Sequence, residues 1–135
     1  MKLENILLDE NLNLKVCDFG FATNKNVNKL KSFRGTFTYM APEIKEGKEY
    51  DGKKVDIFST GVILFVIVHG IFPFTGAKQD EYYSLIKKGL LNSYWKKVGG
   101  THLSDEFKDL FIKMVSYDPA KRPSVAKIIV HDWFN

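Results

Sequence analysis

The stretch KLENILLDENLNLKVCDFG, residues 2–20, decides how this chain is interpreted, because it places two short apolar runs between polar residues. Ile6 to Leu8 and Leu14 to Cys17 are rich in β-prone side chains, and the polar residues between them are typical of a turn. The stretch therefore predicts a β-hairpin. Pairing of its two strands brings Asn5 and Asp18 to the same end.

An amide oxygen and a carboxylate that converge in this way suggest a site for a divalent cation. Oxygen ligands of this kind are those that hard divalent ions prefer, and Lys2 nearby would suit a cation that carries phosphate oxygens. The alternative is an ordinary hairpin whose polar ends are solvated. The spacing of Asn5 and Asp18 alone does not decide between the two.

Length and composition favour one domain with a real core, since the chain has 135 residues of which 44% are apolar and 14% aromatic. The formal net charge of +4 is spread along the chain and no aromatic stacking platform accompanies it, so we expect no nucleic-acid partner. The one cysteine, Cys17, excludes an internal disulfide and is expected to be a buried, reduced thiol.

The only candidate for a membrane span is GVILFVIVHG, residues 61–70. Its apolar core is too short to cross a bilayer, so we expect a helix that is buried on all sides within the protein and no membrane span. The start of the sequence shows no signal peptide. Together with the single free thiol, this predicts an intracellular, cytoplasmic protein.

After an irregular segment from Phe19 to Phe37, the pattern becomes helical at Pro42. Apolar spacing predicts helices over Asp56 to His69 and over Gln79 to Lys88. A third helix follows Ser104, a natural N-cap, and a fourth follows Ser124. The expected buried faces are Tyr82, Leu85 and Ile86 in the second helix, Phe107, Leu110, Phe111, Met114 and Val115 in the third, and Val125, Ile128 and Ile129 in the fourth. The fold class predicted is mainly α with a small β-hairpin.

Five motifs then appear in one order: KLEN (2–5), DFG (18–20), GT with YMAPE (35–43), DIFSTGVIL (56–64) and DPAKRPS (118–124). In order and spacing they resemble the C-terminal lobe of eukaryotic serine/threonine protein kinases. The stretch around residues 61–74 looks most like the calcium/calmodulin-dependent and energy-sensing branch. The resemblance covers residues 1–135 and implies a partial, truncated kinase domain without its N-terminal lobe.

The resemblance assigns roles to residues of the catalytic site. It implies that Asn5 and Asp18 hold Mg²⁺ that bridges the phosphates of ATP, and that Lys2 contacts the phosphate being transferred. Thr36 matches the threonine that packs beside the catalytic loop and marks serine/threonine specificity. The implied cofactors are therefore ATP and Mg²⁺, and the implied partners are protein substrates.

Three further residues match architectural positions of the family. Glu43 would form a buried ion pair with Arg122 that ties the activation segment to the last helices. Asp56 would accept hydrogen bonds from the backbone of the catalytic loop at the start of the buried helix.

Ser32 matches a position at which phosphorylation orders the activation loop in many kinases. Lys29, Lys31 and Arg34 are its basic neighbours and could pair with a phosphate there. The alternative is that Ser32 is simply a polar loop residue. We expect the loop from Asn24 to Arg34 to be mobile and the hairpin to be loosely held.

In the family the catalytic base lies five positions before the metal-binding asparagine, which corresponds to the position immediately before Met1. The glycine-rich loop and the strand lysine of the N-terminal lobe also have no counterpart in these 135 residues. We therefore expect the chain alone to be inactive, with the missing lobe or an upstream kinase as further partners. The alternative is a kinase remnant that serves as a non-catalytic interaction module.

Overall fold

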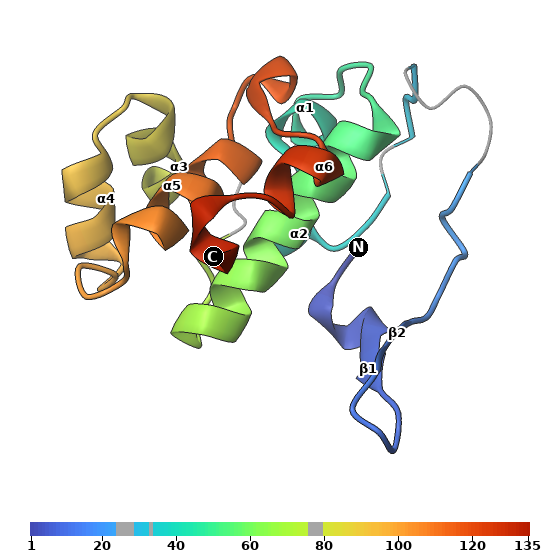
Figure 1. Cartoon of the computed structure of the whole chain (residues 1–135). Coiled ribbons are helices and arrows are strands. Elements are labelled where there is room, and N and C mark those ends of the chain that lie inside the picture. The colour runs from blue at the N-terminus through green and yellow to red at the C-terminus, as the bar shows by residue number, and fades with distance from the viewer. Residues whose placement is uncertain (24–28, 33, 76–79) are drawn as a thin grey trace.

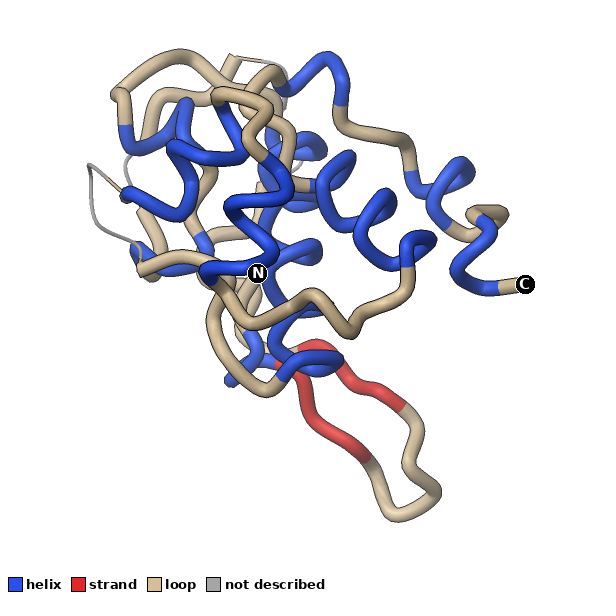
Figure 2. The backbone as a smooth tube through the Cα atoms, turned by 90° about the vertical axis from the view of Figure 1, so that its left-hand side faces the viewer, coloured by secondary structure: helices blue, strands red, loops and turns tan. Residues whose placement is uncertain are grey.

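The computed structural model describes residues 1–23, 29–32, 34–75 and 80–135. A β-hairpin of β1 (Ile6–Leu8) and β2 (Leu14–Val16) follows a short 3-10 turn, η1 (Leu3–Asn5), and extends away from a body of helices (Figures 1 and 2). The strands pair antiparallel, with Ile6 opposite Val16. The predicted fold class, mainly α with a small hairpin, is confirmed.

The helical body consists of four longer helices and several single turns. The longer helices are α2 (Gly52–His69), α3 (Glu81–Lys87), α4 (Leu91–Lys97) and α5 (Asp105–Met114). The short elements are η2 (Phe37–Tyr39), α1 (Pro42–Lys45), η3 (Pro119–Lys121), α6 (Val125–Ile128) and η4 (Asp132–Phe134). In Figure 1, α2 crosses the middle of this body beside α5.

Helix α2 begins earlier than predicted because Asp51, rather than a later residue, caps it. The Asp51 side chain accepts a hydrogen bond from the Lys53 amide at 2.8 Å, as an N-cap does. The helix is capped at its C-terminal end by Gly70. Its φ of 81° is a left-handed conformation that glycine adopts without strain, and its amide donates a hydrogen bond to the Val66 carbonyl. The prediction that residues 61–70 are buried on all sides is wrong at the end of the helix, where Ile67 is 62% exposed.

The core is an aromatic cluster between α2 and α5. Phe65 on α2 and Phe111 on α5 have ring centroids 4.7 Å apart, and both are fully buried. Gly61 lets the two helices approach closely, because a Cβ there would lie only 3.0 Å from the Cβ of Met114. Ser104 caps α5 by accepting a hydrogen bond from the Phe107 amide, as predicted. The face predicted for α5 is buried throughout.

Other predictions need correction. Val125 and Ile129 were expected in a buried face but are 63% and 64% exposed, because α6 is only one turn long and only Ile128 packs on the core. Helix α3 begins at Glu81, with Asp80 as its N-cap, and Gln79 lies outside the described residues. Helix α4 was not predicted. Cys17 is half-buried rather than buried. No helix in the described ranges is long and apolar enough to cross a membrane.

Candidate active site

The open end of the hairpin places Asn5 and Asp18 on adjacent strand ends. The Cys17 amide donates a hydrogen bond to the Asn5 carbonyl at 2.9 Å, so Asp18 is the first residue beyond the last paired position. The backbone of Asp18 has a φ of 61°, a left-handed conformation that is uncommon outside glycine, asparagine and aspartate. Its carboxylate accepts a hydrogen bond from the Gly20 amide at 3.1 Å. The chain therefore turns sharply just after Asp18.

The donor set at this end fits a magnesium ion in its chemistry. A carboxylate and a side-chain amide supply hard oxygen ligands, and Mg²⁺ in proteins commonly takes only one or two such ligands and completes its shell with water and phosphate oxygens. The Asp18 side chain is exposed, so it is open to solvent and to a ligand. Over the described ranges, no cluster of three or more His, Cys, Asp or Glu residues is arranged to hold a metal by itself.

The residues that precede the hairpin lie against the start of α2 and against η2. The amino group of Met1 is 3.9 Å from the Asp56 carboxylate, whose side chain is 65% exposed. The Tyr39 hydroxyl lies beside the Leu3 backbone and the Glu4 carboxylate, and burial raises the pKa of Tyr39. Lys2 is half-buried, and its carbonyl accepts the Asn5 amide. Asp56 thus lies beside the N-terminal amino group, and its hydrogen bonds to the backbone of the catalytic loop stay a prediction.

Leu30 and Ser32 both contact Tyr50, which lies between α1 and α2. Leu30 and Tyr50 form an antiparallel bridge in which each amide donates to the other carbonyl at 3.0 Å. The Ser32 Oγ lies 3.0 Å from the Tyr50 hydroxyl, which also donates to the Ser32 carbonyl. Residues 24–28 and 33, which fall in the predicted mobile loop, lie outside the described residues.

Two of the basic neighbours of Ser32, Lys31 and Arg34, contact other side chains. The Lys31 ammonium lies 2.9 Å from the Glu49 carboxylate, and the Arg34 guanidinium lies over the Phe21 ring. Lys29 is exposed. Thr36 is exposed and precedes η2, where its carbonyl accepts the Tyr39 amide at 3.0 Å. Sequence reasoning did not find Tyr50 as the partner of Ser32, because no local pattern marks a contact across 18 residues.

Glu43 and Arg122 form a bidentate ion pair in the interior. The two carboxylate oxygens lie 2.6 and 2.7 Å from the two terminal guanidinium nitrogens, and the residues are 6% and 1% exposed. Arg122 also donates to the carbonyls of Ser116 and Lys54, and it lies over the Phe58 ring. All of its donor nitrogens are therefore occupied, which is the condition under which a buried charge is tolerated.

Comparisons with known proteins agree with this arrangement. The family model described as "Protein kinase domain" matches residues 1–134. Over 136 residues the chain is 40% identical to "Probable serine/threonine-protein kinase MARK-A" of Dictyostelium discoideum, covering 100% of this chain and 12% of that protein.

Two further relatives are also serine/threonine kinases by name. "Serine/threonine-protein kinase SRK2E" of Arabidopsis thaliana is 38% identical over 137 residues, which cover 99% of this chain and 38% of the relative. "Serine/threonine-protein kinase SIK2" of Gallus gallus is 37% identical over 134 residues, which cover 98% and 16%. The chain thus spans well under half the length of these relatives. It belongs to the protein kinase family and is similar to its serine/threonine members.

Proposed function

We propose that residues 1–135 form part of a serine/threonine kinase domain that transfers the γ-phosphate of ATP to hydroxyl groups of protein substrates. The observation that carries this proposal is the match of the kinase family over residues 1–134. The hairpin end with Asn5 and Asp18 supports it, as does the activation segment fixed by the Glu43–Arg122 pair.

In this proposal each residue of the site has one task. Asn5 and Asp18 would hold Mg²⁺, which when bound neutralises the charge of the ATP phosphates. Lys2 would contact the phosphate that is transferred. Glu43 and Arg122 would keep the activation segment, including Thr36, at a fixed distance from the hairpin, so that the substrate hydroxyl and the phosphate meet in one geometry.

Ser32 would be the regulatory position of the same segment. Ser32 is an exposed residue, its hydroxyl lies 3.0 Å from that of Tyr50, and Lys29, Lys31 and Arg34 are close to it in the sequence. A phosphate on Ser32 would add charge that these side chains can neutralise, which orders a loop of this kind. In the unmodified chain Lys31 is held by Glu49, so phosphorylation would have to compete with that exposed ion pair, which is a weak one.

We further propose that the 135 residues alone do not catalyse the transfer. The family base would precede Asn5 by five positions, and none of the residues numbered here occupies that place. Loss of general-base catalysis costs about 10²- to 10⁴-fold in rate. The hairpin also leaves apolar side chains in solvent, among them Leu8 at 63%, Leu12 at 76% and Phe19 at 69% exposure. Such a surface suits packing against another lobe.

The experiment compares the isolated chain with a chimaera in which a kinase N-terminal lobe and His-Arg-Asp segment precede residue 1. We expect the chimaera to phosphorylate a serine peptide with radiolabelled ATP, and the isolated chain to remain at the background of its Asp18→Ala variant. In the chimaera, Asp18→Ala should abolish transfer. Asp105→Asn is the matched control, since Asp105 is 97% exposed on α5 far along the chain, and it should leave the rate unchanged.

Two results would contradict the proposal. Turnover by the isolated chain above the Asp18→Ala background would overturn its predicted inactivity. A chimaera that folds, as judged by cooperative thermal unfolding, and yet transfers no phosphate would instead favour the alternative of a non-catalytic interaction module.

A further inference from the structure

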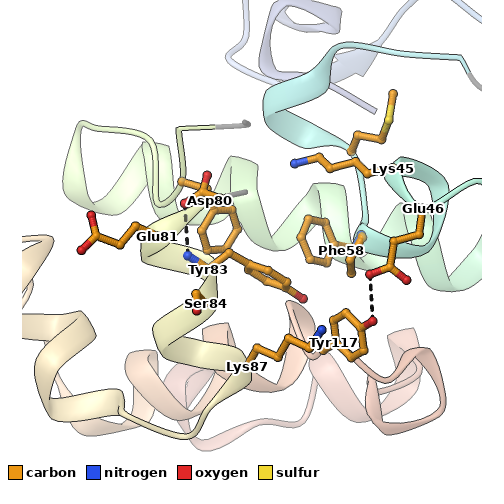
Figure 3. A pocket seen from close by; sticks show the side chains of 12 residues that line it. Lys45, Glu46, Phe58, Asp80, Glu81, Tyr83, Ser84, Lys87 and Tyr117 are labelled. Atoms are coloured by element: carbon orange, nitrogen blue, oxygen red, sulfur yellow. Dashed lines mark hydrogen bonds between the residues drawn. The ribbon is translucent and has the colours of Figure 1, made fainter. Parts of the chain in front are cut away.

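A cavity of about 540 Å³ lies on the helical body, away from the hairpin, between α1, the first half of α2 and α3 (Figure 3). This volume falls within the range of about 300 to 1,000 Å³ that is usual for ligand pockets. Four aromatic rings contribute to its wall: Phe58, Phe74, Tyr83 and Tyr117. The rings of Phe74 and Tyr83 pack edge to face with centroids 4.9 Å apart, so the apolar part of the wall is fixed by the core.

The acidic side chains of the wall already have partners. Glu46 pairs with Lys48 and accepts a hydrogen bond from the Tyr117 hydroxyl at 2.8 Å. Asp80 caps α3 by accepting a hydrogen bond from the Tyr83 amide, and it also accepts one from the Thr75 hydroxyl at 2.8 Å. Glu81 pairs with Lys97. Glu46 and Glu81 are therefore each paired with a lysine outside the pocket wall, whereas Asp80 keeps its charge and is held by hydrogen bonds.

The two lysines of the wall, Lys45 and Lys87, form no such ion pairs in the part of the chain that the structure describes. Among the described residues, neither Lys45 nor Lys87 has a carboxylate within ion-pair distance. Their ammonium groups lie over aromatic rings instead, Lys45 at 5.3 Å from the centroid of Phe37 and Lys87 at 3.8 Å from that of Tyr117. The segments outside the described ranges contain no aspartate or glutamate in the sequence. Over the described ranges, the pocket wall thus has two lysines without an ion pair, although the Asp80 carboxylate acts on Lys45 and the Glu46 carboxylate interacts with Lys87 at longer range.

Figure 3 shows that the Lys45 nitrogen points across the upper part of the pocket and that Lys87 reaches along its lower edge toward Tyr117. Lys45 is half-buried, and burial lowers the pKa of its ammonium group, even though the nearby Asp80 carboxylate acts in the opposite direction. A second carboxylate beside Lys45 would raise the pKa of its ammonium group again and so offset the effect of burial. Lys45 and Lys87 are therefore the groups of this wall that an anionic ligand could contact.

We propose that this pocket binds an aromatic group that carries a carboxylate, with the ring between Phe58, Tyr83 and Tyr117 and the carboxylate at Lys45 and Lys87. Such a group can belong to a small aromatic acid or to a polypeptide in which an aromatic residue adjoins an acidic one. Both share the same chemistry. The proposal does not depend on phosphoryl transfer, because none of the lining residues belongs to the hairpin that contains Asn5 and Asp18.

The test is a titration of the 135-residue chain, followed by NMR, with 2-naphthoate and with its neutral analogue 2-naphthamide. We expect 2-naphthoate to shift the amide signals of α1 and α3, and to bind about tenfold or more tightly than the amide, which is the contribution of one charge-assisted hydrogen bond. In a second arm, a peptide with a Phe-Glu pair is compared with the same peptide carrying Phe-Gln. Preferential binding of 2-naphthoate identifies a small-molecule site, and preferential binding of the peptide identifies a site for a partner polypeptide.

Variants of single lysines distinguish binding in the pocket from attraction of the probes to the overall charge of the chain. Lys45→Met retains the length of the side chain and should remove the preference for the carboxylate, and Lys87→Met should reduce it. Lys88→Met is the matched control, because Lys88 is exposed, adjacent to Lys87 and outside the pocket lining, and it should bind like the parent chain. Asp18→Ala should also bind normally, which keeps this result separate from the proposed kinase function.

The proposal is overturned if the acid and the amide bind equally, if neither acidic probe shifts α1 or α3, or if Lys88→Met weakens binding as much as Lys45→Met. A Ser84→Phe variant, which fills the cavity from α3, provides a further check because it should block both probes while the chain still unfolds cooperatively. Undiminished binding to Ser84→Phe places the ligand elsewhere and rejects this site.

Discussion

The Arg122 guanidinium is buried with one carboxylate, that of Glu43, as its only described partner of opposite charge. We expect Glu43→Gln to lower the free energy of unfolding by about 3 to 5 kcal/mol, because it leaves a buried positive charge without compensation. Urea denaturation followed by tryptophan fluorescence measures this loss. The glutamine keeps the size of the side chain, so the change reports the charge.

Glu49→Gln is the control for this prediction. It breaks the exposed Lys31–Glu49 pair, whose side chains are 72% and 50% exposed, and pairs of that kind contribute at most about 1 kcal/mol. Equal losses in Glu43→Gln and Glu49→Gln would mean that the interior pair contributes no more to stability than an exposed one.

Among the elements, the close crossing of α2 and α5 depends on Gly61. A methyl group there would meet Met114 Cβ at 3.0 Å and Val115 Cγ1 at 3.1 Å. Overpacking of this kind costs about 1 to 3 kcal/mol, which outweighs the gain of up to about 1 kcal/mol in helix propensity from glycine to alanine. We therefore expect Gly61→Ala to lower the midpoint of thermal unfolding.

Lys53→Ala on the exposed face of the same helix is the comparison, and it should change the free energy of unfolding by no more than about 0.5 kcal/mol. A Gly61→Ala chain that melts at the same temperature or higher would show that α5 can move away from α2 without loss of packing.

The hairpin turn depends on Asp9. Its carboxylate accepts the amides of Asn13 and Asn11 at 2.8 and 3.0 Å, and these hydrogen bonds, that of Asn13 first, hold the pKa of Asp9 below its ordinary value of 3.8. Because the folded-state pKa is lowered, the turn gains stability from this carboxylate above the ordinary pKa and loses it as the pH falls through the lowered value.

An NMR pH titration measures this effect through the amide signals of Asn11 and Asn13. We expect both signals to titrate with one midpoint below 3.8 and to stop titrating in Asp9→Asn. A midpoint at or above that ordinary value would show that the carboxylate does not hold the turn in solution.

Sequence reasoning succeeds for elements whose signals are local. The hairpin follows from two β-prone runs, and α5 follows from a serine cap and a regular apolar face. It fails for α6, where Val125 and Ile129 look like a helical face but the helix stops after one turn and leaves them in solvent. It also misses α4, which begins at Leu91 after an N-cap residue, Leu90, that offers no side-chain hydrogen bond, so only tertiary packing of Tyr94 and Trp95 marks it.

For the candidate site, the motifs identify Asn5, Asp18, Glu43 and Arg122, while their surroundings come only from the fold. Tyr50 belongs to no motif, and although Tyr39 opens YMAPE, that motif does not mark its contact with Leu3 and Glu4. The aromatic cavity beside α1 is likewise invisible in the sequence, because it is formed by residues of three helices and of the loops that contain Phe74 and Tyr117.

In the whole molecule, the hairpin extends away from the helices (Figure 1). The aromatic core belongs to the helical body, whereas most apolar side chains of the hairpin are exposed. Regions with few buried contacts open at lower free energy than the core. We therefore expect the amides of β1 and β2 to exchange hydrogen well before those of α2 and α5, as measured by native-state hydrogen exchange. Equal protection of the hairpin and α2 would contradict this division.

The hydrogen bonds between Ser32 and Tyr50 affect how readily Ser32 can be modified. A protein kinase that modifies Ser32 must hold the residues around it in an extended form, yet Leu30 and Ser32 are already bonded to Tyr50. In the proposed function, the segment would have to detach from Tyr50 before it could enter another enzyme, so Ser32 would be modified only while these hydrogen bonds are open. The Tyr50 hydroxyl would then slow the modification of Ser32 without taking part in phosphoryl transfer.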